Sequence, residues 1–203
     1  MKMLVAATAL ASAFQAQGSP PEAGITLQNA SVRIYRTNAG ALAGVAHRPG
    51  VVVWLEDGPS AKAGRAIWLD DVAVPPADGA GTGPIAIVQP LSQGGSRAST
   101  PASGSNPGGA PFTGLSFNTL FENARVSVIR ARMEVGAREG FHTHASDTIV
   151  VHLSGGDIED SADGRTTVNR WKTGDIEFEA RGSSHSARNI SHAVDVVLVT
   201  LKP

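Results

Sequence analysis

Three histidines are the residues of this chain whose spacing could support chemistry. His142 and His144 are two positions apart, so in a β-strand their side chains point to the same face. His185 follows beyond a strand-like segment and can join them only if the sheet curls back on itself. Converging imidazoles, in a chain without cysteine, suit a divalent metal such as Fe(II), Zn, Ni or Cu. The sequence therefore predicts a metal site inside a closed or nearly closed sheet.

Glycines at fixed distances from these histidines complete two motifs that resemble those of the cupin family. The first cupin motif is Gly, five residues, His-x-His, three or four residues, Glu, six residues, Gly. The second is Gly, five residues, Pro-x-Gly, two residues, His, three residues, Asn. The matching positions are Gly136, His142, His144 and Gly155 in the first motif and Gly174, Gly182, His185 and Asn189 in the second.

Two motif positions depart from the family. Ala180 stands where cupins have Pro, and Thr148 stands where they have a metal-binding Glu. Three histidines with an open position still form a known catalytic arrangement. The resemblance therefore implies a site for Fe(II), Zn, Ni or Mn, with lower affinity and a changed metal preference, and its ligands are His142, His144 and His185.

The segment after the first motif offers further polar residues. Asp147 is turned away from the barrel by strand alternation unless a bulge brings it in. Thr148 could hydrogen-bond a metal-bound water. His152 has the same parity as Thr148, so it points inward as a ligand, as a base outside the set of metal ligands, or as a polar core residue with one hydrogen bond. We predict Thr148 and His152 as the catalytic residues beside the metal.

Two further groups are expected to be exposed. Glu177 and Glu179 share a face opposite Ile176 and Phe178, which is typical of a solvated strand face, with a catalytic carboxylate as the alternative. His192 lies in a turn and is expected to face solvent.

Strand patterns dominate the second half of the chain, and no segment has a helical period. We expect turns at Glu139–Gly140 and Asp163–Gly164. The expected strands are Val126–Met133, Thr148–Leu153, Thr166–Trp171, Ile176–Ala180 and Ala193–Leu201. The fold class is all-β, and the resemblance implies a cupin-type β-barrel, a double-stranded β-helix of the jelly-roll kind.

The first half looks like a degraded copy of the second. Strands are expected at Ser31–Arg36, Val51–Leu55 and Ile85–Val88. The repeat is carried by three alignments: Asn29–Arg36 with Asn123–Arg130, Val51–Leu55 with Ile149–Leu153, and Gly64–Ala66 with Gly164–Thr166. Only His47 stands near the place of the metal histidines. We therefore expect a degenerate cupin-like half over 19–91 and the histidine-bearing barrel over 117–203, with chance similarity as the alternative.

Two segments lie outside these halves. Residues 1–18 read as a signal peptide, with Lys2 before the apolar run Met3–Ala13 and a cleavage site at Ala11–Ala13; an N-terminal helix is the alternative. Residues 92–116 are rich in Gly, Ser and Pro, which predicts a flexible linker, with a lid over the site as the alternative.

Composition restricts the partners. The net charge of −1 gives no reason to expect nucleic acid or an anionic membrane surface. The expected signal peptide predicts an exported protein, periplasmic or extracellular. No cysteine follows the apolar run and no later run could span a bilayer, so we expect no membrane anchor. A small-molecule substrate is the expected partner, and open sheet edges favour a homodimer.

Two functions follow from the resemblance. The first is a metalloenzyme, a dioxygenase or related oxygenase, acting on a small organic molecule that enters the barrel mouth. The alternative is a non-enzymatic cupin of the cell envelope that binds a small molecule or has a structural role. Fold alone does not choose between them.

Overall fold

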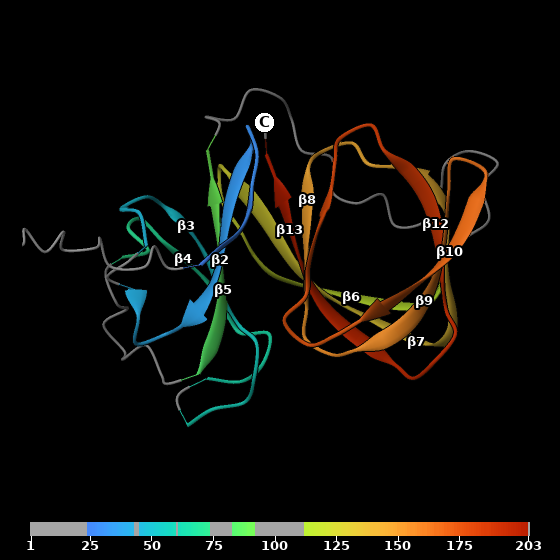
Figure 1. Cartoon of the computed structure of the whole chain (residues 1–203), viewed down its shortest axis with the longest axis horizontal. Coiled ribbons are helices and arrows are strands. Elements are labelled where there is room, and N and C mark those ends of the chain that lie inside the picture. Colours follow the sequence, from blue (N-terminus) through green and yellow to red (C-terminus); the bar gives the residue numbers. More distant parts are fainter. Residues whose placement is uncertain (1–23, 43–44, 60, 74–82, 92–111, 203) are drawn as a thin grey trace, which may run out of the picture.

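The computed structural model of the chain describes residues 24–42, 45–59, 61–73, 83–91 and 112–202. Within these ranges the regular elements are thirteen β-strands in two sheets (Figure 1). The all-β prediction is confirmed. The described part of the chain contains no helix with the length and hydrophobicity that a membrane crossing requires. The predicted signal peptide, and residues 92–111 of the predicted linker, lie outside the described residues.

The first sheet has five antiparallel strands in the order β1-β2-β5-β3-β4. Its central strands, β3 and β5, are almost entirely buried and mostly apolar, as β-branched residues favour when both faces of a strand are covered. In chain order the strands are β1 (Ile25–Gln28), β2 (Val32–Asn38), β3 (Gly50–Trp54), β4 (Ala66–Leu69) and β5 (Pro84–Pro90).

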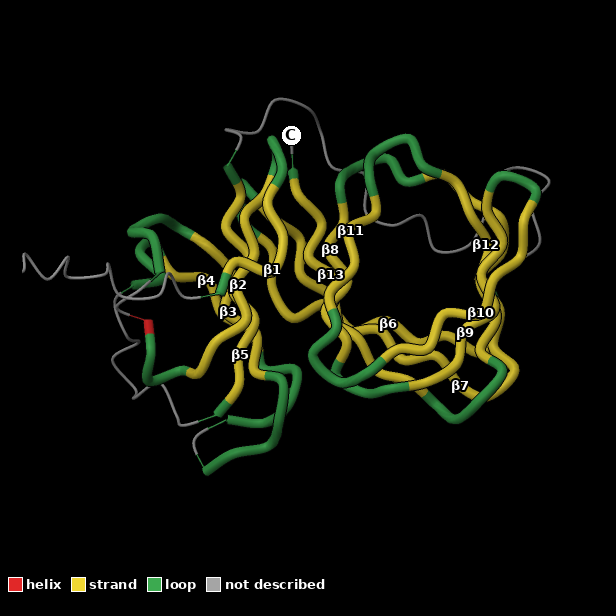
Figure 2. Tube along the Cα trace, in the orientation of Figure 1, coloured by secondary structure: helices red, strands yellow, loops and turns green. Residues whose placement is uncertain are grey.

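The second sheet has eight strands in the order β10-β9-β12-β7-β13-β8-β11, with β6 paired to β7. It curls into a barrel, as Figure 2 shows. The strands are β6 (Thr113–Glu122), β7 (Val126–Thr143), β8 (Thr148–His152), β9 (Gly156–Ala162), β10 (Arg165–Trp171), β11 (Ile176–Glu179), β12 (Ser184–Asn189) and β13 (Val194–Leu201). This architecture confirms the predicted cupin-type β-barrel.

Two predicted boundaries differ from the structure. The turn expected at Glu139–Gly140 is absent, because β7 runs without a break from Val126 to Thr143. The pairing of β7 with β12 instead shifts register between His185 and Ala187, a bulge that accommodates an extra residue without ending the strand. β6 begins at Thr113, before the expected end of the linker at residue 116.

The first sheet repeats part of the second. The path β1-β2-β5-β3-β4 has the same order as β6-β7-β13-β8-β11 when each strand is matched to its counterpart. Both β1 and β6 shift register against their partner strand. The shift in β1 lies between Ile25 and Leu27, and β6 has a comparable one between Thr119 and Phe121 and a second one between Thr113 and Leu115. Described strands of the first half form one open path, and none of them corresponds to β9, β10 or β12. The shared geometry supports the proposal of a reduced copy, and the two-barrel description stays a prediction.

The turns before β2 and β7 are also alike. The side-chain oxygen of Asn29 accepts the backbone N–H groups of Ser31 and Val32. Asn123 does the same with Arg125 and Val126. The predicted alignment of Asn29–Arg36 with Asn123–Arg130 therefore coincides with matching local structure.

The third alignment of the two halves is wrong. Gly64 donates its N–H to the carbonyl of Trp54, just as Gly174 donates to the carbonyl of His152, and both glycines have φ near +80°. Gly164 instead lies in the turn between β9 and β10, with Asp163 at φ 51°, as the predicted hairpin requires. Gly64 therefore corresponds to Gly174. The sequence misleads because the β9–β10 hairpin separates Gly174 from β8 in the second half.

One face of each sheet packs against the other sheet. The shared apolar core takes Val51, Val53 and Leu55 from around β3 and Ile149, Val151 and Leu153 from around β8. Strands β2, β5, β7 and β13 contribute the rest of this core. The face of β3 and the face of β8 that carry these residues therefore pack against each other between the two sheets. The opposite face of β8 lines the inside of the barrel.

Candidate metal centre

The structure brings the three predicted histidines together. His142 lies near the end of β7 and His144 directly follows that strand, while His185, on β12, is the cross-strand partner of His142. Partners in an antiparallel pair share a face of the sheet. One nitrogen from each ring lies within 4.8 Å of the others. The curled sheet thus produces the convergence that the sequence predicts.

Contacts on the far side of two rings fix their orientation. His142 donates from Nδ1 to the carbonyl of Gly140 at 3.0 Å, and His185 donates from Nδ1 to Asp160 Oδ1 at 2.9 Å. The Nε2 atoms of His142 and His185 take no part in these two hydrogen bonds. His185 Nε2 lies 3.1 Å from His144 Nε2. Oriented imidazoles of this kind are usual among metal ligands.

The three histidines are largely buried but reachable, with His144 only 11% exposed. Burial, together with the charges of His142 and His185, lowers the pKa of His144 to about 4. Its ring is therefore neutral near pH 7, which is the form that binds a metal.

Glu177 and Glu179 point into the barrel, so the expected solvated face is wrong. The alternation was correct, but Ile176 and Phe178 pack outward against the core between the sheets. Glu179 Oε2 lies 3.6 Å from His144 Nδ1, and Oε1 lies 3.8 Å from His185 Nε2. Burial, then repulsion from neighbouring carboxylates, raises the pKa of Glu179 to about 8.

His152 is completely buried beside the other glutamate. Its Nε2 lies 3.5 Å from Glu177 Oε2, and Trp171 donates to Glu177 Oε1 at 2.8 Å. Neither ring nitrogen of His152 has a hydrogen bond to another described residue, so the single hydrogen bond expected for a polar core residue is absent. The imidazole packs on the Trp171 ring at a centroid distance of 4.2 Å.

Thr148 also faces inward, as predicted. Its hydroxyl lies 3.3 Å from the hydroxyl of Thr200, and the side chain is buried. Asp147 is not in the site, because its carboxylate accepts the backbone N–H of Arg181 at 2.8 Å.

Two histidines lie away from the centre. His47 in the first half is 75% exposed and contacts Asp71 at 2.8 Å. His192 is exposed, as expected.

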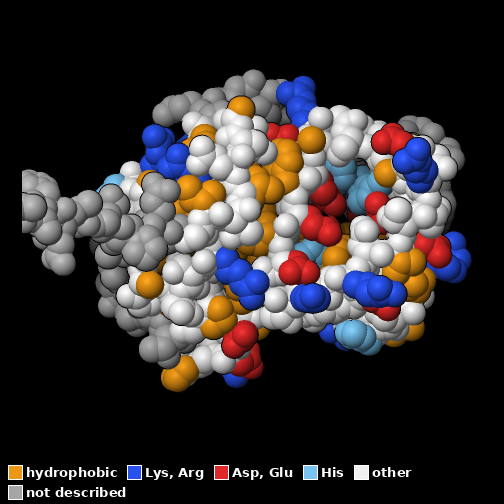
Figure 3. Space-filling model, in the orientation of Figure 1, with side chains coloured by type: hydrophobic (Ala, Val, Ile, Leu, Met, Phe, Trp, Pro, Cys, Tyr) orange, Lys and Arg blue, Asp and Glu red, His pale blue; other side chains and the backbone are white. Residues whose placement is uncertain are grey.

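Sequence reasoning missed Asp160 and Glu139, and it kept Glu179 as a catalytic carboxylate only as the alternative to a solvated residue. Asp160 binds His185, and Glu139 Oε1 lies 3.6 Å from His142 Nε2. The pairing of Glu179 with Thr148 could have revealed Glu179, because it places an acid opposite the vacant motif position. Figure 3 shows histidine and acidic side chains gathered where the surface is hollowed over the barrel.

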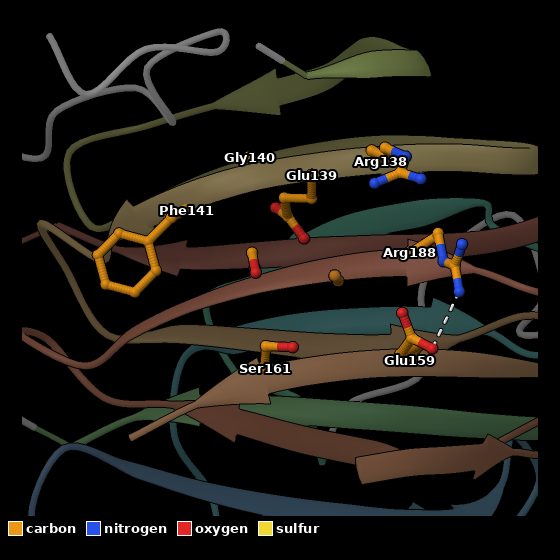
Figure 4. A pocket seen from close by; sticks show the side chains of 9 residues that line it. Arg138, Glu139, Gly140, Phe141, Glu159, Ser161 and Arg188 are labelled. Atoms are coloured by element: carbon orange, nitrogen blue, oxygen red, sulfur yellow. Dashed lines mark hydrogen bonds and ion pairs between the residues drawn. The ribbon is translucent and has the colours of Figure 1, made fainter. Parts of the chain in front are cut away.

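A separate pocket of about 270 Å³ is lined by residues of β7, β9 and β12 (Figure 4). Arg188 donates to Glu159 across it at 3.0 Å. Arg188 and Ser186 alternate with His185 along β12, so they point away from the three histidines. This pocket therefore lies on another face of β12 from the histidine cluster, although Glu139 both lines the pocket and contacts His142.

Several solved structures similar to this chain are described as cupins. One is a cupin domain from Bordetella pertussis Tohama I, with 23% identity and a TM-score of 0.43, covering 47% of this chain and 100% of that one. Another is KdgF from Halomonas sp., with 18% identity and a TM-score of 0.39, covering 44% of this chain and 80% of that one. The polyketide cyclase RemF from Streptomyces resistomycificus has 16% identity and a TM-score of 0.40, with 48% and 69% covered. Neither a protein-family model nor a curated protein matches the sequence.

Proposed function

Because the second half of the chain folds as a cupin barrel, we propose that it binds one divalent transition metal and acts as a metalloenzyme on a small organic molecule. The ligands in this proposal are His142, His144 and His185. The observation that carries it is the convergence of three ring nitrogens within 4.8 Å, with two rings held by Gly140 and Asp160.

The donor set fits such a metal. Imidazole nitrogens suit Fe, Zn, Ni and Cu, and three of them leave coordination positions open. A bound metal would supply Lewis-acid chemistry there, and Fe(II) would add reactivity toward dioxygen. Asp160 would keep His185 in the tautomer that presents Nε2 to the site.

Glu177 and His152 form the second part of the proposed site. The imidazole has no hydrogen bond to a described residue, and the carboxylate 3.5 Å away is anchored by Trp171. This pair could hold a proton and exchange it with a substrate in the barrel. The Thr148 hydroxyl, beside Thr200, offers a neutral donor on the same inner face.

The proposed reaction class is oxygenation of a small molecule. Metal content tests the first step: the protein is purified without a histidine tag and its metals are measured by mass spectrometry. The proposal predicts close to one equivalent per chain, either as purified or after reconstitution with Fe(II), Ni, Zn or Mn. Failure to take up any of these metals would favour the alternative of a non-enzymatic binding protein.

Oxygen consumption against a panel of small organic substrates tests the second step. We expect a substrate-dependent rate in the metal-loaded protein and its loss in His185→Ala. A rate that is unchanged in His185→Ala would end the assignment of this residue as a ligand.

Export to the periplasm or the extracellular space also remains a proposal, based on residues 1–18. So does a homodimer: β10 has mostly exposed side chains, and no other described strand pairs with its outer edge, which a second chain could join.

A further inference from the structure

The barrel lacks a glutamate at the motif position, where Thr148 stands. We infer that Glu179 supplies the missing carboxylate, as the anionic fourth ligand of the proposed metal, and that it does so from β11 instead of β8. The inference rests on the proposed function, since it concerns the same three-histidine site.

Strand register places Glu179 next to the vacant position. Glu179 is the direct cross-strand partner of Thr148 in the pairing of β11 with β8. Side chains of such partners start about 5 Å apart and point to the same face. A carboxylate at 179 therefore enters the barrel beside the place where the cupin motif puts its own.

One carboxylate oxygen of Glu179 approaches the nitrogen that His185 presents to the site. The two carboxylate oxygens of Glu179 lie 3.6 Å from His144 Nδ1 and 3.8 Å from His185 Nε2. Donor atoms on one metal, with bonds of about 2.0–2.2 Å, stand roughly 3 Å apart. A side-chain rotation that moves the oxygens by about 1 Å would therefore reach an ion held between the rings.

The negatively charged surroundings of Glu179 would also be stabilised by a cation. Its side chain is 22% exposed, and among the described residues no donor hydrogen-bonds its carboxylate. The other charged groups that act on it are the carboxylates of Glu139, Glu177 and Asp160. Buried carboxylates are ordinarily paired or coordinated to metal, and a divalent ion would offset this accumulation of negative charge.

Glu139 is the competing carboxylate. It lies 3.6 Å from His142 Nε2, and no contact joins it to the other two rings. Glu179 contacts two of the three rings, and it comes from a strand separate from those that hold the histidines. The geometry therefore favours Glu179, with Glu139 as the matched control.

Cobalt binding tests the inference. Metal-free wild type, Glu179→Gln, Glu139→Gln and Glu177→Gln are titrated with Co(II) by calorimetry, and the visible absorption of each complex is recorded. We expect Glu179→Gln to weaken Co(II) by about 100-fold or more, beyond the loss usual for a group that only orients a ligand. Its absorption bands should also shift, because an oxygen donor is lost. Glu177→Gln should keep the wild-type spectrum.

The outcomes distinguish failure of the Glu179 inference from failure of the proposed three-histidine metal site. If wild type binds Co(II) and Glu179→Gln binds it with the same affinity and spectrum, the inference is wrong and the three-histidine site stands. A shift in Glu139→Gln in place of Glu179→Gln would likewise overturn it. If wild type binds no Co(II), the proposed function fails as well. Adding Thr148→Glu to Glu179→Gln should restore affinity, and a single cooperative thermal transition in each variant would show that the fold is intact.

Discussion

β3 and β8 occupy the same place in two sheets of the same strand order, yet their inward side chains differ in kind. Cross-strand registers match Val51 with Ile149 and Val53 with Val151. On the inward face the same registers set Trp54 against His152 and, on the neighbouring strands, Leu69 against Glu179. Ile67 likewise corresponds to Glu177. The first half fills its inner face with apolar side chains, and the second half lines it with acids and imidazoles.

The comparison separates what holds the chain together from what could do chemistry. The faces that meet between the sheets are apolar in both halves, because both must bury them in one core. The inner faces differ in the kind of side chain they present, apolar in the first half and ionisable in the second. Asp160 and His185 stand on β9 and β12, which have no counterpart among the described strands of the first half. A metal centre therefore needs both the exchanged side chains and the added strands.

The largest expected effect is a loss of metal affinity that only a histidine substitution in the second half should cause. His185→Ala removes one of three nitrogen donors, so divalent-metal affinity should fall by more than about 100-fold, beyond the effect of losing an outer group. His47→Ala, the only histidine substitution available in the first half, should leave affinity unchanged. Calorimetric titration of both variants with Zn²⁺ measures the contrast. Equal losses in the two would place the metal elsewhere.

Exchanging the matched inner residues should change stability in opposite directions. Leu69→Glu puts an unpaired carboxylate against the apolar core of the first half and should cost about 3 kcal/mol. Glu179→Leu removes a carboxylate with acidic neighbours, so the metal-free protein should become more stable. Urea unfolding of metal-free samples gives both values. A destabilised Glu179→Leu would mean that the barrel needs this acid even without metal.

Asp160→Asn should weaken the metal site without dismantling it. The carboxylate that accepts from His185 Nδ1 is replaced by an amide, so the ring loses its charged partner. Affinity should fall by about 10–100-fold, the usual cost of such a change. Glu159→Gln, on the outer face of the same strand, is the control and should bind metal as wild type does. A normal affinity in Asp160→Asn would show that this contact does not orient the ligand.

The stability of the metal-free protein should depend on pH through Glu179. Its pKa is raised from 4.5 to about 8 in the fold, so its contribution is intact below pH 4.5 and is lost as pH rises toward 8. The lowered pKa of His144 acts in the other direction, with stability lost as pH falls from 6.5 toward 4. Above pH 6.5 only the Glu179 effect remains, so melting temperature should fall between pH 6.5 and 8. In Glu179→Leu that fall should be largely absent; an identical fall would assign it to another group.

The smallest expected effects are equal in the two halves. Asn29 and Asn123 each accept two backbone N–H groups in matching turns. Asn29→Ala and Asn123→Ala should each cost about 1 kcal/mol, the usual contribution of such hydrogen bonds. Chemical denaturation of the single variants tests the match. Costs that differ several-fold would mean that the turns are alike in geometry only.

Sequence patterns predicted the class, most strands of the second half and the convergence of the histidines, because alternation and motif spacing are local signals. The face of β11 was assigned wrongly because alternation gives parity but not direction. Ile176 and Phe178 turn outward to a core that exists only when the two sheets meet. Asp160 gave no signal at all, since only the pairing of β9 with β12 brings it to His185.

The bulge in β7 shows the same limit. Glu139–Gly140 reads as a turn, but the strand continues because β12 pairs on both sides of the irregularity. Gly64 was matched to the wrong glycine, since one hairpin of the second half has no described equivalent in the first. These errors concern long-range pairing, which a local pattern does not encode.

Anomalous diffraction from crystals grown with Co(II) tests the central claim most directly. The account predicts one strong peak inside the barrel, about 2.0–2.2 Å from a ring nitrogen of each of His142, His144 and His185. A map without a peak between these three rings, in a protein saturated with the ion, would contradict it.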